Sequence, residues 1–219
     1  MSIKPAHAAE FGYLRYRADG TAALAIAGAS YGAHGQGARI GYAIVDTEFG
    51  KILAAATIHG LCWIGVQESA ERLERELRDD FRRAGLITED QSATESARRV
   101  AAIAGGAAGT IEFTLDIPAT PFQLAVWREL CAIPRGATRS YGEIALRIGN
   151  PAAARAVGRA NGSNPLAIAI PCHRAIGAGG TLTGYRWGVA YKRRLLAHER
   201  AIAQPDLPLT ATRGAIRPG

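Results

Sequence analysis

The sequence has few cysteines and no long apolar run, and both shortages exclude whole classes of protein. Its three cysteines, Cys62, Cys131 and Cys172, stand far apart and form neither a C-x-x-C pair nor a zinc-finger pattern with histidine. A disulfide framework is therefore excluded, and a reducing intracellular compartment is expected. The longest apolar stretch near the start, Thr21 to Ser30, is too short to span a membrane and lies too deep for a usual signal peptide. The sequence predicts a soluble, cytoplasmic protein.

Charge is spread unevenly along the 219 residues. Residues 41–117 carry 13 acidic and 8 basic side chains, whereas residues 118–200 carry 12 basic and only 3 acidic ones. A basic half beside an acidic half favours contact between one half and a polyanion such as nucleic acid. A solvated surface with an accidental bias explains the same counts, so charge alone leaves both interpretations open.

The first half of the chain has the pattern of a small α+β domain. Residues 1–39 are rich in glycine and alanine with little periodicity, so a poorly structured N-terminal extension is expected there. Further on, Leu73, Leu77 and Phe81 recur every four residues among charged ones, which indicates an amphipathic helix. Alternating apolar runs bounded by turn residues indicate an antiparallel sheet. We predict a domain over residues 40–117, with strands at 40–46, 52–59, 61–66 and 111–117 and helices at 69–84 and 94–104.

The second half has the pattern of a mostly helical domain. A proline-rich boundary at 118–121 opens a domain predicted to cover residues 118–200, followed by a flexible tail at 201–219. Three helix-start signals follow one another, namely Thr120 before Pro121, Ser140 three residues before Glu143, and Asn150 before Pro151. The last two predicted helices are separated by a short turn containing glycine, which is typical of a helix-turn-helix.

The helix predicted at 152–162 carries small side chains almost throughout. Ala154 and Ala156 flank Arg155, and Arg159 follows one turn later. A helix that reads the major groove usually presents long polar side chains to base edges, and this helix has few. Small side chains suit a close approach to the minor groove. Packing of the same alanines and glycines against neighbouring helices is the alternative.

Cys172 is the candidate reactive group. Leu166 to Pro171 is predicted to be a buried strand, and Cys172, His173 and Arg174 follow it directly. Cationic or hydrogen-bonding neighbours favour the thiolate, which is the reactive form of cysteine. Most single cysteines are small buried apolar residues, and that is the interpretation of the other two cysteines.

These residues resemble the active site of the O6-alkylguanine-DNA alkyltransferases, also called methylated-DNA–protein-cysteine methyltransferases. The similarity is colinear, strong over residues 118–200 and weak over 41–117, and is closest to the alkyltransferase part of bacterial Ada-type proteins. Ada-type proteins carry a zinc-binding domain and an AraC-like domain upstream; neither fits into the first 40 residues, so zinc and transcription activation are not carried over. The segments that carry the resemblance are 122–133, 140–142, 150–159, 164–165, 171–174, 184–188 and 195–199, with 30–50 adding similarity to the Ada-type linker region.

The resemblance implies a fold and a reaction. The fold would be a ribonuclease H-like α+β domain followed by a winged helix-turn-helix domain. Cys172 would take an alkyl group from O6 of guanine, or O4 of thymine, in duplex DNA, irreversibly and once per molecule. His173 would act as its base through one water, and Glu199 would fix the histidine tautomer. Tyr141 and Asn164 complete the implied catalytic set, and the protein would act as a monomer without a cofactor.

The resemblance also implies how DNA is held. The target nucleotide must leave the duplex to react. Arg155 would fill the vacated stack, Arg159 would contact a phosphate, and Ala154 and Ala156 would lie against the groove. Tyr141 would contact the flipped base and its 3′ phosphate.

The implied base pocket contains two departures from some relatives. The carbonyls of Cys172 and Ala175 would read the guanine amino group, the Arg186 N–H would donate to O6, and the Tyr185 hydroxyl would protonate the leaving guanine. Ala167 stands where some relatives have proline, and Trp187 where some have glycine. We expect a tighter pocket that favours methyl over benzyl adducts.

Two other functions compete with alkyl transfer. A non-catalytic protein that binds alkylated guanine is one, but such relatives replace the cysteine that is present here. A Cys–His hydrolase is the other, and the adjacency of Cys172 to His173 with no glycine-rich nucleophile turn argues against it.

Overall fold

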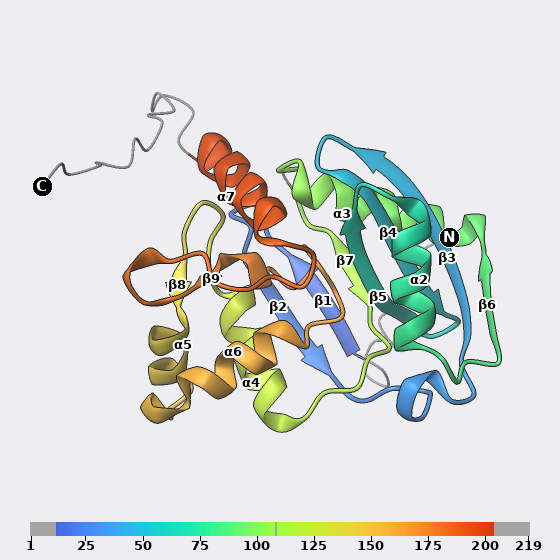
Figure 1. Ribbon diagram of the computed structural model, residues 1–219, viewed down its shortest axis with the longest axis horizontal. Coiled ribbons are helices and arrows are strands. Elements are labelled where there is room, and N and C mark those ends of the chain that lie inside the picture. The colour runs from blue at the N-terminus through green and yellow to red at the C-terminus, as the bar shows by residue number, and fades with distance from the viewer. Residues whose placement is uncertain (1–11, 108, 204–219) are drawn as a thin grey trace, which may run out of the picture.

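The computed structural model describes residues 12–107 and 109–203 (Figure 1). Its largest sheet begins with an antiparallel meander of β3 (Arg39–Thr47), β4 (Gly50–Thr57) and β5 (Gly60–Gln67). Gly50 closes the first turn with a φ of 108°, a backbone conformation that side chains disfavour. β6 (Leu86–Glu89) joins β3 in parallel, so the strand order is β5-β4-β3-β6. The predicted meander is confirmed.

Two helices pack on this sheet. α2 (Ala70–Asp80) begins where the Ser69 side chain accepts a hydrogen bond from the backbone of Arg72, and it buries Leu73 and Leu77. It packs on β5 and lies over the front of the sheet in Figure 1. α3 (Thr94–Ala104) follows the short 3-10 turn η2 (Gln91–Ala93) and packs on β3 and β4. Both predicted helices are present, the first of them shorter than expected.

Residues 12–26 contradict the expected poorly structured extension. They form a hairpin of β1 (Gly12–Tyr16) and β2 (Ala22–Ile26), and β1 also pairs with β7 (Glu112–Thr114) in a sheet of order β2-β1-β7. Leu14 and Tyr16 point inward, whereas Tyr13 and Arg15 point outward. The abundance of glycine and alanine hid this period-two alternation, which is the signal of a half-buried strand. Residues 1–11 of the predicted extension lie outside the described residues, and η1 (Ala33–Gly35) follows the hairpin.

The first two helices of the second half begin at the capping residues that the sequence predicts. Thr120 and Gln123 form a capping box at the start of α4 (Pro121–Cys131), and Ser140 and Glu143 form another at α5 (Tyr141–Arg147). Asn150 makes no side-chain cap, because the third helix opens with a 3-10 turn, η3 (Pro151–Ala153), before α6 (Ala154–Gly162). α4 and α5 both pack on α6.

The apolar run before Cys172 is not the strand that was predicted. Only Leu166 forms a bridge, to Ile64, and the chain then turns with Ile168 at a φ of 67°. A short apolar run is equally consistent with a buried turn, so periodicity could not separate the two. The remaining elements are β8 (Arg139–Ser140), η4 (Cys172–Arg174), β9 (Ala175–Ile176), η5 (Ala178–Gly180) and α7 (Val189–Ala203).

Both halves share one apolar core. A continuous cluster of buried side chains runs from Leu14 through Trp63 and Trp127 to Leu195, across the predicted boundary at 118–121. The division into two domains stays a prediction, as does the tail, of which 204–219 lie outside the described residues. Among the helices of the described residues, none is long and apolar enough to cross a membrane.

Candidate active site

Cys172 begins η4 and is 2% exposed. The Asn164 side chain holds the preceding loop against it, because its Nδ2 donates to the Cys172 Sγ at 3.1 Å and to the Ile170 carbonyl at 2.9 Å. Its Oδ1 accepts from the Leu166 backbone N–H at 2.9 Å. One amide therefore fixes both the loop and the sulfur, which places Asn164 between α6 and the reactive residue.

His173 and Arg174 converge on one buried carboxylate. His173 Nε2 lies 2.9 Å from Glu199 Oε1, while Arg174 donates from Nη2 to Oε1 at 2.7 Å and from Nε to Oε2 at 2.9 Å. Burial opposes the charge of Glu199, but His173 and Arg174 together hold the pKa of this carboxyl well below its usual range. The other ring nitrogen of His173, Nδ1, is buried and has no hydrogen-bond partner within the described part of the chain. His173 is thus oriented on one side and free to take a proton on the other.

The thiol of Cys172 is protonated at rest. Burial raises its pKa to about 11, although the hydrogen bond from Asn164 and the charge of Lys192 act in the opposite direction. Hydrogen-bonding and cationic neighbours do favour the thiolate, but loss of hydration outweighs them, so the pKa of the thiol lies above its ordinary value. The reaction needs a base to remove this proton.

A pocket of about 380 Å³ opens beside the thiol. One side comes from α6, where Gly158, Asn161 and Gly162 follow the helical repeat of three to four residues. The opposite side is the loop before α7. The lining residues are Tyr141, Gly158, Asn161, Gly162, Cys172, Thr183, Gly184, Tyr185, Arg186 and Trp187.

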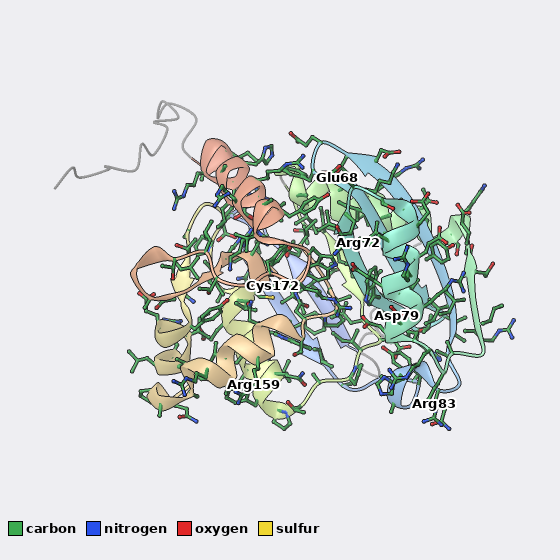
Figure 2. All side chains as sticks on the ribbon, in the orientation of Figure 1. Glu68, Arg72, Asp79, Arg83, Arg159 and Cys172 are labelled. Atoms are coloured by element: carbon green, nitrogen blue, oxygen red, sulfur yellow. The ribbon has the colours of Figure 1, made fainter. Side chains whose placement is uncertain are left out.

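The outer face of α6 carries free positive charge. Arg155 and Arg159 are exposed, whereas Ala154 and Ala156 are half-buried and Val157 is fully buried. Figure 2 shows Cys172 near the middle of the molecule, with Arg159 beside α6 below it in the view. Among residues 12–107 and 109–203, neither arginine has an acidic partner, so both are available to a polyanion.

Comparison with known proteins identifies the family. Residues 121–201 match the family model described as 6-O-methylguanine DNA methyltransferase, DNA binding domain. The methylated-DNA–protein-cysteine methyltransferase of Methanosarcina acetivorans is 40% identical over 158 residues, which are 72% of this chain and 97% of that protein. The chain belongs to the methylated-DNA–protein-cysteine methyltransferase family.

Other relatives agree with this membership. The inducible methylated-DNA–protein-cysteine methyltransferase of Bacillus subtilis is 42% identical, over 70% of this chain and 87% of its own. The crystal structure of Mycobacterium tuberculosis OGT in complex with DNA superimposes with a TM-score of 0.61 at 39% identity, covering 74% of this chain and 94% of that one. The match spans only part of some relatives, namely 47% of the regulatory protein ada of Salmonella typhimurium and 58% of the Mycobacterium bovis methyltransferase.

Within this family site, the structure brings most of the predicted residues together. Tyr141, Tyr185, Arg186 and Trp187 line the pocket with Cys172. Two predicted pocket residues, Ala167 and Ala175, are fully buried and are not among its lining residues.

The side chain of Arg186 is held by contacts within the protein. It forms an ion pair with Asp80 at 2.5 Å and lies over the rings of Trp63 and Trp187, at 5.9 and 5.6 Å from their centroids. These contacts tie the pocket loop to α2.

Arg174 links segments around the site. In addition to the bonds from Nε and Nη2 to Glu199, the Arg174 Nη1 donates to the carbonyls of Gly20 at 2.7 Å and Ile133 at 2.6 Å.

The described residues hold no cluster of histidine, cysteine and acidic side chains suited to a metal ion.

Sequence reasoning missed two buried residues beside the site. Lys192 is fully buried, donates from Nζ to the Thr183 carbonyl at 3.1 Å, and has a pKa lowered by burial. The sequence feature that could have indicated Lys192 is a basic residue on the buried face of α7, where Tyr191 and Leu195 also lie. Tyr16 lies behind the loop that precedes Cys172, and no local pattern pointed to it.

Proposed function

We propose that this chain repairs alkylated DNA by moving an alkyl group from O6 of guanine onto Cys172, once per molecule. The observation that carries the proposal is the buried thiol that lines a base-sized pocket beside a histidine with one nitrogen bound and one unpartnered. The names of its relatives support the same reaction.

His173 removes the thiol proton. Its Nε2–H donates to Glu199, so Nδ1 carries the lone pair and accepts the proton through one water. Glu199 is ionised and stabilises the imidazolium that forms. The thiolate then exists only while the histidine is charged, which keeps Cys172 unreactive between encounters.

The thiolate attacks the alkyl carbon in a single displacement. A carbon–sulfur bond forms, the carbon–O6 bond breaks, and its electron pair passes to guanine. Burial, followed by the neighbouring Cys172, raises the pKa of Tyr185 well above its usual value, so its hydroxyl stays protonated and can donate to the leaving base. The proton gained by His173 restores Tyr185. A thioether is a poor leaving group, so the protein is consumed.

DNA is held by phosphate contacts and by the minor groove. α6 enters with Ala154 and Ala156 against the groove, Arg155 in the vacated stack and Arg159 at a phosphate. The flipped base then enters between α6 and the loop before α7, with Tyr141 against it. The carbonyl of Cys172 reads the guanine amino group, and the Arg186 N–H donates to O6.

The pocket favours small adducts, including those on O4 of thymine. Trp187 is 2% exposed, lines the pocket and packs on Tyr185 with ring centroids 5.3 Å apart. A rigid indole at this place leaves less room for a benzyl group than for a methyl group.

The finer architecture is part of the proposal. The β5-β4-β3-β6 sheet with its helices supports a ribonuclease H-like N-terminal part. The α5–α6 pair, joined through Gly149 at a φ of 76°, supports a winged helix-turn-helix in the second part.

Intact-mass measurement after incubation with a duplex carrying O6-methylguanine tests the function. The expected result is a stable gain of one CH2 that Cys172→Ser abolishes and that Cys62→Ser and Cys131→Ser retain. Binding without an adduct would indicate a lesion-binding protein, and turnover of a peptide or ester would indicate a hydrolase.

A further inference from the structure

In the loop before Cys172, the carbonyls of Ile168 and Ala169 accept no backbone hydrogen bond from the described residues. Ile168 has a φ of 67°, an unusual conformation for a β-branched residue, and tight contacts join Ala169 N to Ala167 O at 2.6 Å and Cys172 N to Ile170 O at 2.7 Å. The carbonyls of Ile168 and Ala169 lie in residues at most 2% exposed and need donors from elsewhere. A loop built in this way keeps its shape only if its surroundings hold it.

The Tyr16 hydroxyl supplies one donor for both carbonyls, from a strand more than 150 residues earlier in the chain. It donates to the Ile168 carbonyl at 2.9 Å and also contacts the Ala169 carbonyl. A hydroxyl has one proton, so the two carbonyls share it. Burial raises the pKa of Tyr16 well above its usual value, so the group remains a donor at any ordinary pH. Tyr16 is itself 2% exposed and fixed by its strand.

The same hairpin is bound on the other side of the nucleophile. Arg174, two residues after Cys172, donates to the carbonyl of Gly20 in the β1–β2 turn at 2.7 Å. The β2 strand is held in turn by Arg128 of α4, which donates to the Leu24 carbonyl at 3.1 Å. The hairpin therefore contacts the chain both before and after Cys172.

We propose that Tyr16 is a positioning residue for alkyl transfer, which sets the place of the Cys172 sulfur by holding the carbonyls of Ile168 and Ala169. The proposal rests on the proposed function. It assigns an active-site task to a hairpin that lies outside the matched residues 121–201. Displacement of a reacting atom by about 1 Å costs on the order of 100-fold in rate, so loss of one such hydrogen bond is measurable.

Tyr16→Phe tests the proposal, because it removes only the hydroxyl. Tyr13→Phe is the matched control, since Tyr13 lies on the same strand, faces outward and is 37% exposed. Single-turnover transfer from methylated duplex is measured over a range of protein concentrations, at a temperature where circular dichroism shows all variants folded. This separates the transfer rate at saturation from the concentration that gives half of that rate.

The expected result is a saturated rate roughly 10- to 100-fold lower in Tyr16→Phe. The half-saturating concentration should stay within about twofold, because α6 is unchanged, and Tyr13→Phe should match the wild type. Transfer from free O6-methylguanine should fall by the same factor as transfer from duplex.

A saturated rate in folded Tyr16→Phe equal to that of Tyr13→Phe would overturn the positioning role. A change confined to the half-saturating concentration would overturn it as well, since it would assign Tyr16 to DNA binding. Failure of the wild type to form any adduct would instead refute the proposed function, so the two failures are distinguishable.

Discussion

Glu199→Gln should affect both stability and activity, because one carboxylate serves His173 and Arg174. Arg174 is 1% exposed, and Glu199 supplies both oxygens to its guanidinium. Removing one partner of such a buried pair leaves an uncompensated charge and typically costs about 3–5 kcal/mol. For a chain of this size that corresponds to a fall in Tm of roughly 6–20 °C.

The same substitution should change how stability depends on pH. The folded-state pKa of Glu199 lies below its unfolded value of about 4.3. A depressed carboxyl pKa contributes stability that is fully present above the unfolded pKa and is lost as pH falls through the folded one. As pH falls below about 4.3, the wild type should therefore lose stability more steeply than Glu199→Gln.

Thermal unfolding and single-turnover transfer measure both effects. Glu129→Gln is the control, because Glu129 also pairs with two arginines, Arg139 and Arg147, but its side chain is 20% exposed. It should cost no more than about 1 kcal/mol. Methyl transfer by Glu199→Gln should fall by about 100-fold or more, since His173 loses its orienting anion. Equal melting temperatures for the two variants, or wild-type transfer by Glu199→Gln, would refute this account of the site.

Three further predictions follow from the pocket and from α6. Alkylation of Cys172 by iodoacetamide, followed by mass spectrometry, should be slow at pH 7 and rise towards pH 11, because burial raises the thiol pKa to about 11; a plateau near pH 8 would contradict this. Arg155→Ala should slow repair of duplex far more than reaction with free O6-benzylguanine, and equal slowing would remove Arg155 from the flipping role. Trp187→Gly should raise the rate with O6-benzylguanine relative to O6-methylguanine, and an unchanged ratio would show that the indole does not limit pocket size.

Local signals in the sequence were sufficient for much of the secondary structure. Thr120 and Ser140 cap helices where their spacing predicts, and the helix at 94–104 has the predicted bounds. Helix caps and apolar periodicity depend on residues only a few positions apart, so both can be recognised in the sequence alone. The same patterns failed at 12–26, where small residues masked the alternation, and at 166–170, where an apolar run folds as a turn.

The sequence by itself determined which residue could react and which family the chain resembles. Only the tertiary structure decided the state of that residue. Burial makes Cys172 a neutral thiol despite its polar neighbours, and burial depends on the packing of the whole core. The tertiary structure also brings the Tyr16 hydroxyl to 2.9 Å from the Ile168 carbonyl, although the two residues are 152 positions apart in the sequence. Contacts of that range follow from how strands and helices pack, and no local pattern in the chain specifies them.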